Sequence, residues 1–248
     1  MGDLMDFVMF GQGDGLIEEK ALAVAGTAEA ERLTGLLEYE KQLWQGGVEL
    51  LAGLDEVGRG PIAGPVVTAA VIWRPGVLLA GINDSKKLSA KKRYALEPLI
   101  KQAALAWAIG VVGVQDIDRW NILQATKVAM LRALHNLPLR PQHLLLDALR
   151  LEDKLPECPL REDLRAYCAL PQTPLIKGDA KSLSIAAASI LAKCYRDRLM
   201  QLFDERYPGY NLGQHAGYPT REHKQAVFDL GPSPIHRRSF VLKPIKGN

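Results

Sequence analysis

Four acidic side chains stand where strand-like apolar runs give way to a turn or a helix. Asp55 and Glu56 follow LAGL, Asp147 follows HLLL, and Asp179 follows LIKG. Sites in α/β sheets form at strand ends, and a rigid group of carboxylates suits Mg²⁺, which prefers oxygen ligands and retains waters. Two such ions about 4 Å apart activate a water and stabilise the leaving oxygen in phosphoryl transfer. Each acid alone is more simply a helix cap or a salt bridge, but their shared setting favours a metal site.

Asp197 is an alternative to Asp179 as the fourth carboxylate of the predicted metal site. If a helix begins near Ser182, Asp197 lies 15 residues further along it, which is about 22 Å along the helix axis. The two acids therefore cannot serve one site. Asp197 is flanked by Arg196 and Arg198, which favours surface ion pairing, so we assign the fourth position to Asp179.

The adjacent pair Asp55 and Glu56 raises a geometric problem. Neighbouring residues in a strand point to opposite faces, so both carboxylates cannot face one metal from a regular strand. We therefore expect the strand to break at this pair, with Gly58 providing the backbone freedom. Gly58-Arg59-Gly60 is then either a plain tight turn or a loop built for the close approach of another molecule.

The elements that position these residues alternate between helices and strands. An apolar repeat near 3.6 predicts a helix over 27–45, which Gly46-Gly47 ends. Further helices are expected at 89–102, at 121–136, from near Ser182 onward, and around 220–230. Strands are expected in the run leading to Asp55 and at 65–73, 107–114, 143–149 and 175–176, while 150–171 reads as a surface excursion. This order predicts an α/β fold with a mixed central sheet flanked by helices and a helical C-terminal part.

Composition narrows the class of protein. The chain has 248 residues, 48% of them hydrophobic and 24% charged, which is typical of a globular protein. No apolar run reaches the roughly 18 residues needed to span a membrane, and the acidic start MGDLMDF is unlike a secretory signal. The three cysteines are odd in number and form no CxxC pair, so we expect a cytoplasmic protein without a zinc knuckle.

Charge is unevenly distributed along the chain. Residues 1–50 hold 3 Lys/Arg and 10 Asp/Glu, whereas the remaining residues hold 28 Lys/Arg and 18 Asp/Glu. The basic body can approach a polyanion such as nucleic acid. Residues 1–28 are rich in Gly and Ala, and we expect them to form a mobile tail that lies away from such a partner.

Several long motifs lie between about residues 33 and 241. In chain order they are LAGLDEVGRGPIAGPVV, NDSKKLS, NILQATKVAM, LLLDAL, KGDAKSLSIAAASILAK, GYPTREH and HRRSF. Together they resemble ribonuclease HII, the bacterial type 2 ribonuclease H. The resemblance implies an RNase H-like fold, with an acidic extension over 1–48 (a tail, then one helix) and a catalytic domain over 49–248. The family's metal-binding acids fall on Asp55, Glu56, Asp147 and Asp179.

The resemblance also implies an activity and its substrates. The expected reaction is Mg²⁺- or Mn²⁺-dependent hydrolysis of the RNA strand of RNA/DNA hybrids. It includes incision 5′ to single ribonucleotides in duplex DNA, and it leaves 3′-hydroxyl and 5′-phosphate ends. The expected partners are RNA/DNA hybrid and DNA duplex containing ribonucleotides, with no membrane and with the enzyme as a monomer.

The family's substrate contacts fall on two further sets of residues. Gly58-Arg59-Gly60 matches the loop that reads the 2′-hydroxyl, a group that only RNA offers. Tyr218 matches the residue that packs on the next sugar, although a Tyr after Gly is also ordinary surface packing. Ser85 and Lys86 match positions near the substrate backbone, and HRRSF is expected to face phosphate.

Two alternative functions remain open on the sequence alone. A type 3 ribonuclease H acts on similar substrates, but its sizeable N-terminal substrate-binding domain does not fit within about 48 residues here. A catalytically inactive nucleic-acid-binding module is the second alternative, and intact acids at all four positions argue against it.

Overall fold

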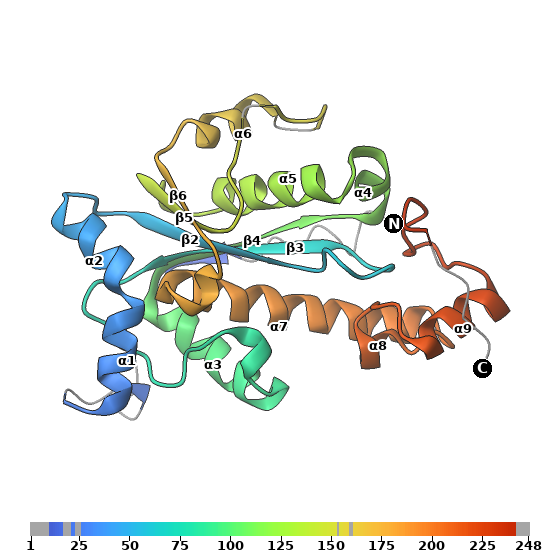
Figure 1. Ribbon diagram of the computed structural model, residues 1–248, viewed down its shortest axis with the longest axis horizontal. Coiled ribbons are helices and arrows are strands. Elements are labelled where there is room, and N and C mark those ends of the chain that lie inside the picture. The colour runs from blue at the N-terminus through green and yellow to red at the C-terminus, as the bar shows by residue number, and fades with distance from the viewer. Residues whose placement is uncertain (1–9, 17–20, 23–25, 153, 159–160, 242–248) are drawn as a thin grey trace.

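A mixed sheet forms the centre of the computed structural model, which describes residues 10–16, 21–22, 26–152, 154–158 and 161–241 (Figure 1). The strand order is β1-β4-β3-β2-β5-β6. Strands β2, β3 and β4 form an antiparallel meander, and β5 and β6 run parallel to β2. The predicted mixed α/β sheet is confirmed. The strand bounds are β1 Phe10–Gly11, β2 Leu51–Val57, β3 Val66–Trp73, β4 Ala104–Val112, β5 His143–Asp147 and β6 Gln172–Leu175.

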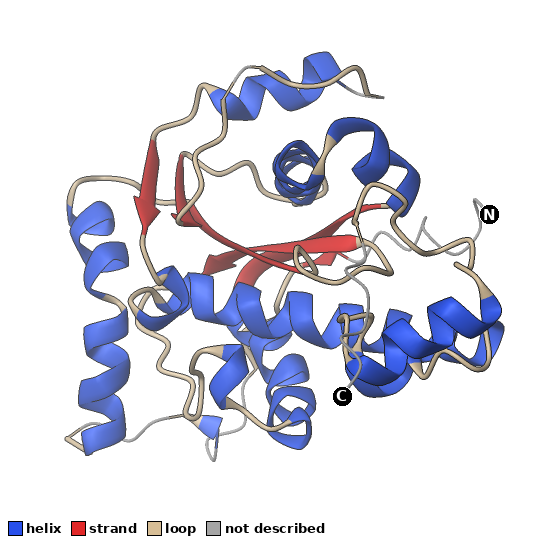
Figure 2. Ribbon diagram, turned by 45° about the vertical axis from the view of Figure 1, so that its right-hand side comes forward, coloured by secondary structure: helices blue, strands red, loops and turns tan. Residues whose placement is uncertain are grey.

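Helices cover both faces of this sheet (Figures 1 and 2). On one face α5 (Ile122–His135) lies over β3 and β4 and contacts α4 (Val114–Trp120) and α6 (Arg161–Cys168). On the other face α7 (Leu183–Arg206) crosses β2 and β3 beside α3 (Ala90–Ala103). The short α8 (Leu212–His215) and α9 (Arg221–Leu230) follow α7. The expected helices at 89–102, 121–136, from 182 onward and around 220–230 are all present.

The predicted helix over 27–45 is instead two helices. Helix α1 (Ala28–Leu36) and helix α2 (Glu38–Gln45) are separated by Leu37, which caps the end of one and the start of the other. Leu33 and Leu37 enter the core beneath the sheet, while Trp44 packs against the cluster that holds Leu51 of β2 and Ile185 of α7. The two helices are therefore docked on the rest of the chain.

Parts of the predicted N-terminal tail are also paired. Phe10 and Gly11 form an edge strand on β4, and Leu22 bridges Leu79. Residues 1–9, 17–20 and 23–25 lie outside the described residues, so the tail prediction is not assessed there. The division into an extension over 1–48 and a domain over 49–248 stays a prediction.

Three short helices, α4, α6 and α8, were not expected from the sequence. Helix α4 follows directly on β4, and its Val114, Ile117 and Trp120 are buried at a spacing of three. This helical spacing is hard to recognise in the sequence, because the strand directly before it is equally rich in apolar residues. Helix α6 lies in the predicted surface excursion; it is strongly polar, and Leu164 is its fully buried apolar anchor. Within the described ranges, no helix combines the length and apolarity that crossing a bilayer requires.

The first turn of α7 is fastened to α2 by a buried carboxylate. Glu40 accepts hydrogen bonds from the hydroxyls of Ser182 (2.6 Å) and Ser184 (2.7 Å) and from the Ser184 amide (3.0 Å). Its side chain is completely buried, and this burial raises the pKa of Glu40 against the opposing effect of the serine hydrogen bonds. A carboxylate at a helix N-terminus is also favoured by the helix dipole. Glu40 thus fixes the start of α7, which directly follows the turn that carries Asp179, against α2.

Glu40→Ala should lower the free energy of unfolding by on the order of 2 kcal/mol, because it leaves buried donors at the α7 N-terminus without a partner. The matched control is Glu38→Ala, on the exposed side of the same helix, which should change stability little. Urea unfolding of the two variants measures the difference. Equal stabilities would contradict the anchoring role.

Candidate active site

The register of two parallel strands brings the first pair of acids together. β2 and β5 are paired up to Leu54 and Leu146, so the next residues, Asp55 and Asp147, stand level on neighbouring strands at the point where β5 ends. Asp55 is 6% exposed. The close approach of α7 depends on Gly53, because a Cβ there would lie 2.4 Å from the main-chain carbon of Ser184.

Asp179 reaches the same edge of the sheet through the chain that follows β6. That chain turns at Lys177, which has a φ of 57°, into a short 3₁₀ helix over Gly178–Ala180. The Gly178 amide donates to the Asp147 carboxylate over 2.8 Å. One hydrogen bond therefore holds Asp147 beside the turn that presents Asp179.

The expected break in the strand at Asp55 and Glu56 is wrong. Both residues stay in a regular ladder with β3, which continues to the pair Val57 and Val67. A break at the acids would lose these main-chain hydrogen bonds. The chain therefore leaves the β2–β3 ladder only at Gly58, where φ is 96°. Glu56 lies next to Arg59, whose guanidinium donates to it over 3.1 Å.

Burial and mutual repulsion act together on the three perturbed carboxyls. The pKa of Asp55 is raised well above its ordinary value, first by burial and then by the charges of Glu56 and Asp147. Burial also raises the pKa of Glu56, although Arg59 opposes it. The pKa of Asp179 is raised by burial and by the charges of Asp84 and Asp147. These groups favour a neighbouring cation.

Lys86 supplies one such positive charge from the protein. Burial works to lower the pKa of Lys86, but the charges of Asp179, Asp55, Asp84 and Asp147 outweigh it and raise that pKa. The ammonium therefore belongs to the acid cluster and is not merely a solvated surface charge. Asp84 was not among the residues predicted from the sequence, although it adjoins Ser85 and Lys86 in the motif NDSKKLS.

The donor set suits divalent cations. It consists of carboxylate oxygens at strand ends, the ligands that Mg²⁺ and Mn²⁺ prefer. One of them, Oε2 of Glu56, is buried and has no hydrogen-bond partner in the described part of the chain, and an orphaned buried acceptor is costly unless something binds it. Among the described residues, no three His, Cys, Asp or Glu side chains converge closely enough to hold a metal ion as they stand.

Asp197 lies elsewhere, as expected, but its partners differ from those expected. It pairs with Arg93 on α3 (3.2 Å) and with Lys193 one turn back along α7. Its sequence neighbour Arg196 is fully buried and donates to main-chain carbonyls, while Arg198 pairs with Glu97.

Two of the predicted substrate contacts, Gly60 and Tyr218, lie side by side, and Arg59 next to Gly60 contacts the acid Glu56. A Cβ added to Gly60 would lie 3.4 Å from the ring of Tyr218, which is 43% exposed. At Gly58 a Cβ would lie 2.4 Å from the Arg196 side chain, so this position requires glycine. The Ser85 hydroxyl is buried against Ser189 of α7 (2.7 Å), so this side chain does not face a substrate.

The sequence profile of the family described as Ribonuclease HII matches residues 52–243. The chain belongs to the ribonuclease HII family. A Ribonuclease HII of Moorella thermoacetica is 49% identical over 216 residues, covering 87% of this chain and 98% of that protein. One of Myxococcus xanthus is 50% identical over 215 residues, covering 86% and 69% respectively.

Solved structures agree with this assignment. The ribonuclease H2 from Pyrococcus horikoshii has a TM-score of 0.61 and 25% sequence identity, and the match covers 77% of this chain and 93% of that one. The fold is RNase H-like, and the resemblance noted in the motifs is confirmed. The chain is thus a divalent-metal-dependent endonuclease of the class that hydrolyses RNA in RNA/DNA hybrids.

Asp55→Asn or Asp147→Asn should reduce cleavage of an RNA/DNA hybrid by at least about 100-fold, the scale at which loss of a preorganised electrostatic group acts. Asp55→Asn should also raise the melting temperature in EDTA, because it removes a buried charge that its neighbours repel. Cleavage assays and thermal melts measure both effects. Near-normal turnover in Mg²⁺ would contradict the assignment of that ligand.

The choice of Asp179 over Asp197 has its own test. Asp179→Asn should be severely impaired in cleavage, whereas Asp197→Asn should keep a rate close to that of the unmodified enzyme, because Asp197 lies about 22 Å along α7 from Ser182 at the helix start. Steady-state rates on one hybrid substrate rank the two variants. The reverse ranking would show that the fourth ligand is misplaced.

Proposed function

We propose that this enzyme also incises duplex DNA on the 5′ side of single embedded ribonucleotides, leaving 3′-hydroxyl and 5′-phosphate ends. The observation that carries the proposal is the short stretch of chain between Asp55 in β2 and the loop that begins at Gly58. Asp55 and Gly58 are three residues apart, so the strand that holds an acid of the cluster continues directly into the predicted 2′-hydroxyl-reading loop. A sugar seated on that loop has its phosphate next to the carboxylates.

The proposed roles of the acids follow from their positions. Asp55 and Asp147, level on neighbouring strands, would bridge or flank the ions, and Asp179 would add to the ligand set. Glu56 follows Asp55 in a regular strand, so its side chain starts from the opposite face; it would approach the ions from the side or support them through bound water. Bound Mg²⁺ or Mn²⁺ would supply an activated water and stabilise the leaving oxygen. Before the ions bind, Lys86 offsets part of the repulsion among these acids.

The proposed reading of the substrate depends on close approach. Gly58 and Gly60 have no side chain to hold a sugar away from the backbone, and the 2′-hydroxyl can both donate and accept hydrogen bonds. The ring of Tyr218, beside Gly60 and partly exposed, would pack on the following sugar and favour one without a 2′-hydroxyl. Arg59 is exposed while its guanidinium contacts Glu56, so it joins the loop to the acids.

The setting of the enzyme is part of the same proposal. We expect a monomer in the cytoplasm that acts on RNA/DNA hybrid and on DNA duplex containing ribonucleotides. The basic charge balance beyond residue 50 supports a nucleic-acid partner, and the odd number of cysteines favours a reducing compartment.

The test uses two duplexes, one with a single embedded ribonucleotide and one with a continuous RNA strand. The unmodified enzyme should cut both in Mg²⁺ and neither in EDTA. Tyr218→Ala should lower turnover at the single ribonucleotide by about tenfold or more, because a shifted sugar misplaces the scissile phosphate. Tyr218→Phe, the matched control, should keep most of the activity, since the ring makes the contact.

Two outcomes would contradict the proposal. Failure of the unmodified enzyme to cut at the single ribonucleotide would show that its substrates are limited to longer RNA stretches. An unchanged rate for Tyr218→Ala on that duplex would show that Tyr218 is an ordinary surface residue that does not position the sugar.

A further inference from the structure

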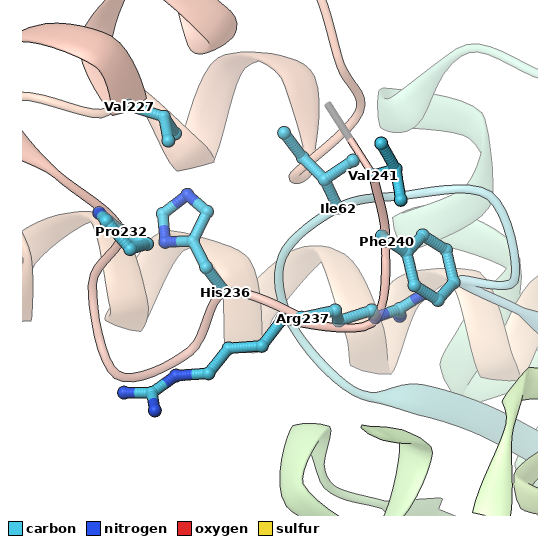
Figure 3. Close-up of a pocket in the computed structure, with 8 residues that line it drawn as sticks. Ile62, Val227, Pro232, His236, Arg237, Phe240 and Val241 are labelled. Carbon is cyan, nitrogen blue, oxygen red and sulfur yellow. The ribbon is translucent and has the colours of Figure 1, made fainter. Parts of the chain in front are cut away.

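Two consecutive residues near the C-terminus contact both parts of the proposed substrate reader. The segment 235–237 runs beside the loop that follows Gly58–Gly60: the Gly64 amide donates to the Ile235 carbonyl (2.9 Å), and the Arg237 amide donates to the Ile62 carbonyl (2.8 Å). Figure 3 shows His236 and Arg237 on this segment, with Ile62 nearby. Both side chains are buried.

The Arg237 guanidinium binds the reading loop from within the protein. It donates to the carbonyls of Gly58, Arg59 (3.2 Å) and Gly64 (2.9 Å), and it packs 5.0 Å from the ring centroid of Phe240. The planar fork of arginine can serve several acceptors at once, which lysine cannot reproduce. Arg237 is 3% exposed, so the expectation that HRRSF faces phosphate is wrong for this residue.

A chain of hydrogen bonds leads from His236 to Tyr218. The Ser233 amide donates to Nδ1 of His236 (3.0 Å), so the proton of the neutral His236 ring is on Nε2. That nitrogen faces Nε2 of His223 at 3.0 Å, which must then be the acceptor. The His223 proton is therefore on Nδ1, and it is donated to the Tyr218 carbonyl over 2.8 Å. Each contact fixes the tautomer of the next ring.

The surroundings keep both rings uncharged near neutral pH. Burial lowers the pKa of His223 to about 4 and also lowers the pKa of His236. The His215 ring stacks on His223 with centroids 4.2 Å apart and accepts from the Gly217 amide. The loop before Tyr218 is thus packed against the same cluster.

We propose that His236 and Arg237 are positioning residues that hold the two parts of the reader, the Gly58–Gly60 loop and Tyr218, at a fixed separation. This inference rests on the proposed function, because only that proposal makes the Gly58–Gly60 loop and Tyr218 a substrate reader. Neither His236 nor Arg237 is assigned a contact with the substrate. Arg237 sets the loop through main-chain carbonyls, and His236 sets Tyr218 through His223. The two halves meet where Gly60 lies beside the Tyr218 ring.

The first test observes the hydrogen-bond chain without any substrate. Nitrogen-15 NMR of the histidine rings in the full-length enzyme at pH 7 should show the Nε2–H tautomer for His236 and the Nδ1–H tautomer for His223. His223→Phe should release the His236 signal from its bonded position. A charged ring, or the opposite tautomer at His223, would contradict the proposed hydrogen bonds from His236 to Tyr218, whichever substrates the enzyme cleaves.

The second test measures steady-state kinetics on the same two duplexes, with the single ribonucleotide and with the continuous RNA strand. His223→Phe should lower kcat at the single ribonucleotide by about tenfold, the scale of a small misplacement, with less change in KM and a smaller loss on continuous RNA. His223→Asn keeps a donor at the Nδ1 position and should restore most of that loss. Arg237→Lys should lower kcat on both duplexes, since both need the loop, whereas Arg206→Lys, at an exposed arginine of α7, should not.

The outcomes separate this inference from the proposed function. Thermal melts confirm that each variant is folded at the assay temperature, and His223→Phe decides the matter if Arg237→Lys does not fold. If the unmodified enzyme cuts at the single ribonucleotide but folded His223→Phe has the same kcat ratio between the duplexes, the positioning role is wrong. If the unmodified enzyme does not cut at the single ribonucleotide, the proposed function is wrong. The NMR result still tests the hydrogen bonds from His236 through His223 to Tyr218.

Discussion

Carboxylates held close together where water is largely excluded are the constraint on which this site depends. Burial and the neighbouring negative charges raise the pKa of Asp55, so the protein must restrain groups that repel one another. Rigid supports do this: the β2–β5 register, the Gly178 amide on Asp147 and the anchored start of α7. Divalent cations then find an oxygen-rich edge that Lys86 neutralises only in part.

A second requirement concerns the loop next to these acids. A loop that offers its backbone to a sugar must have its other main-chain groups satisfied from within, because buried carbonyls are costly when unpaired. Arg237 bonds Gly58 and Gly64, while Arg196 bonds Ala63 and Pro65. Burial lowers the pKa of Arg196 to about 10 and that of Arg237 to about 9, which is the electrostatic cost of this support.

Much of this arrangement was predictable from local sequence, and the rest was not for physical reasons. The acids at strand ends, the Ser182 start of α7 and the exclusion of Asp197 follow from periodicity and helix rise. The unbroken strand at Glu56 was missed because pairing with β3 is a tertiary effect. The inward direction of Arg237 and the Glu40 anchor depend on contacts between segments more than 100 residues apart, which no local pattern contains.

The most direct test of the carboxylate site is to locate the cations themselves. Crystals of the unmodified enzyme grown with Mn²⁺ and measured at the manganese absorption edge would show anomalous peaks at the bound ions. We predict peaks in contact with carboxylate oxygens of Asp55 and Asp147, with Glu56 and Asp179 adjoining. Well-ordered crystals with no peak at this edge of the sheet, or with peaks confined to other acids, would contradict a metal site there.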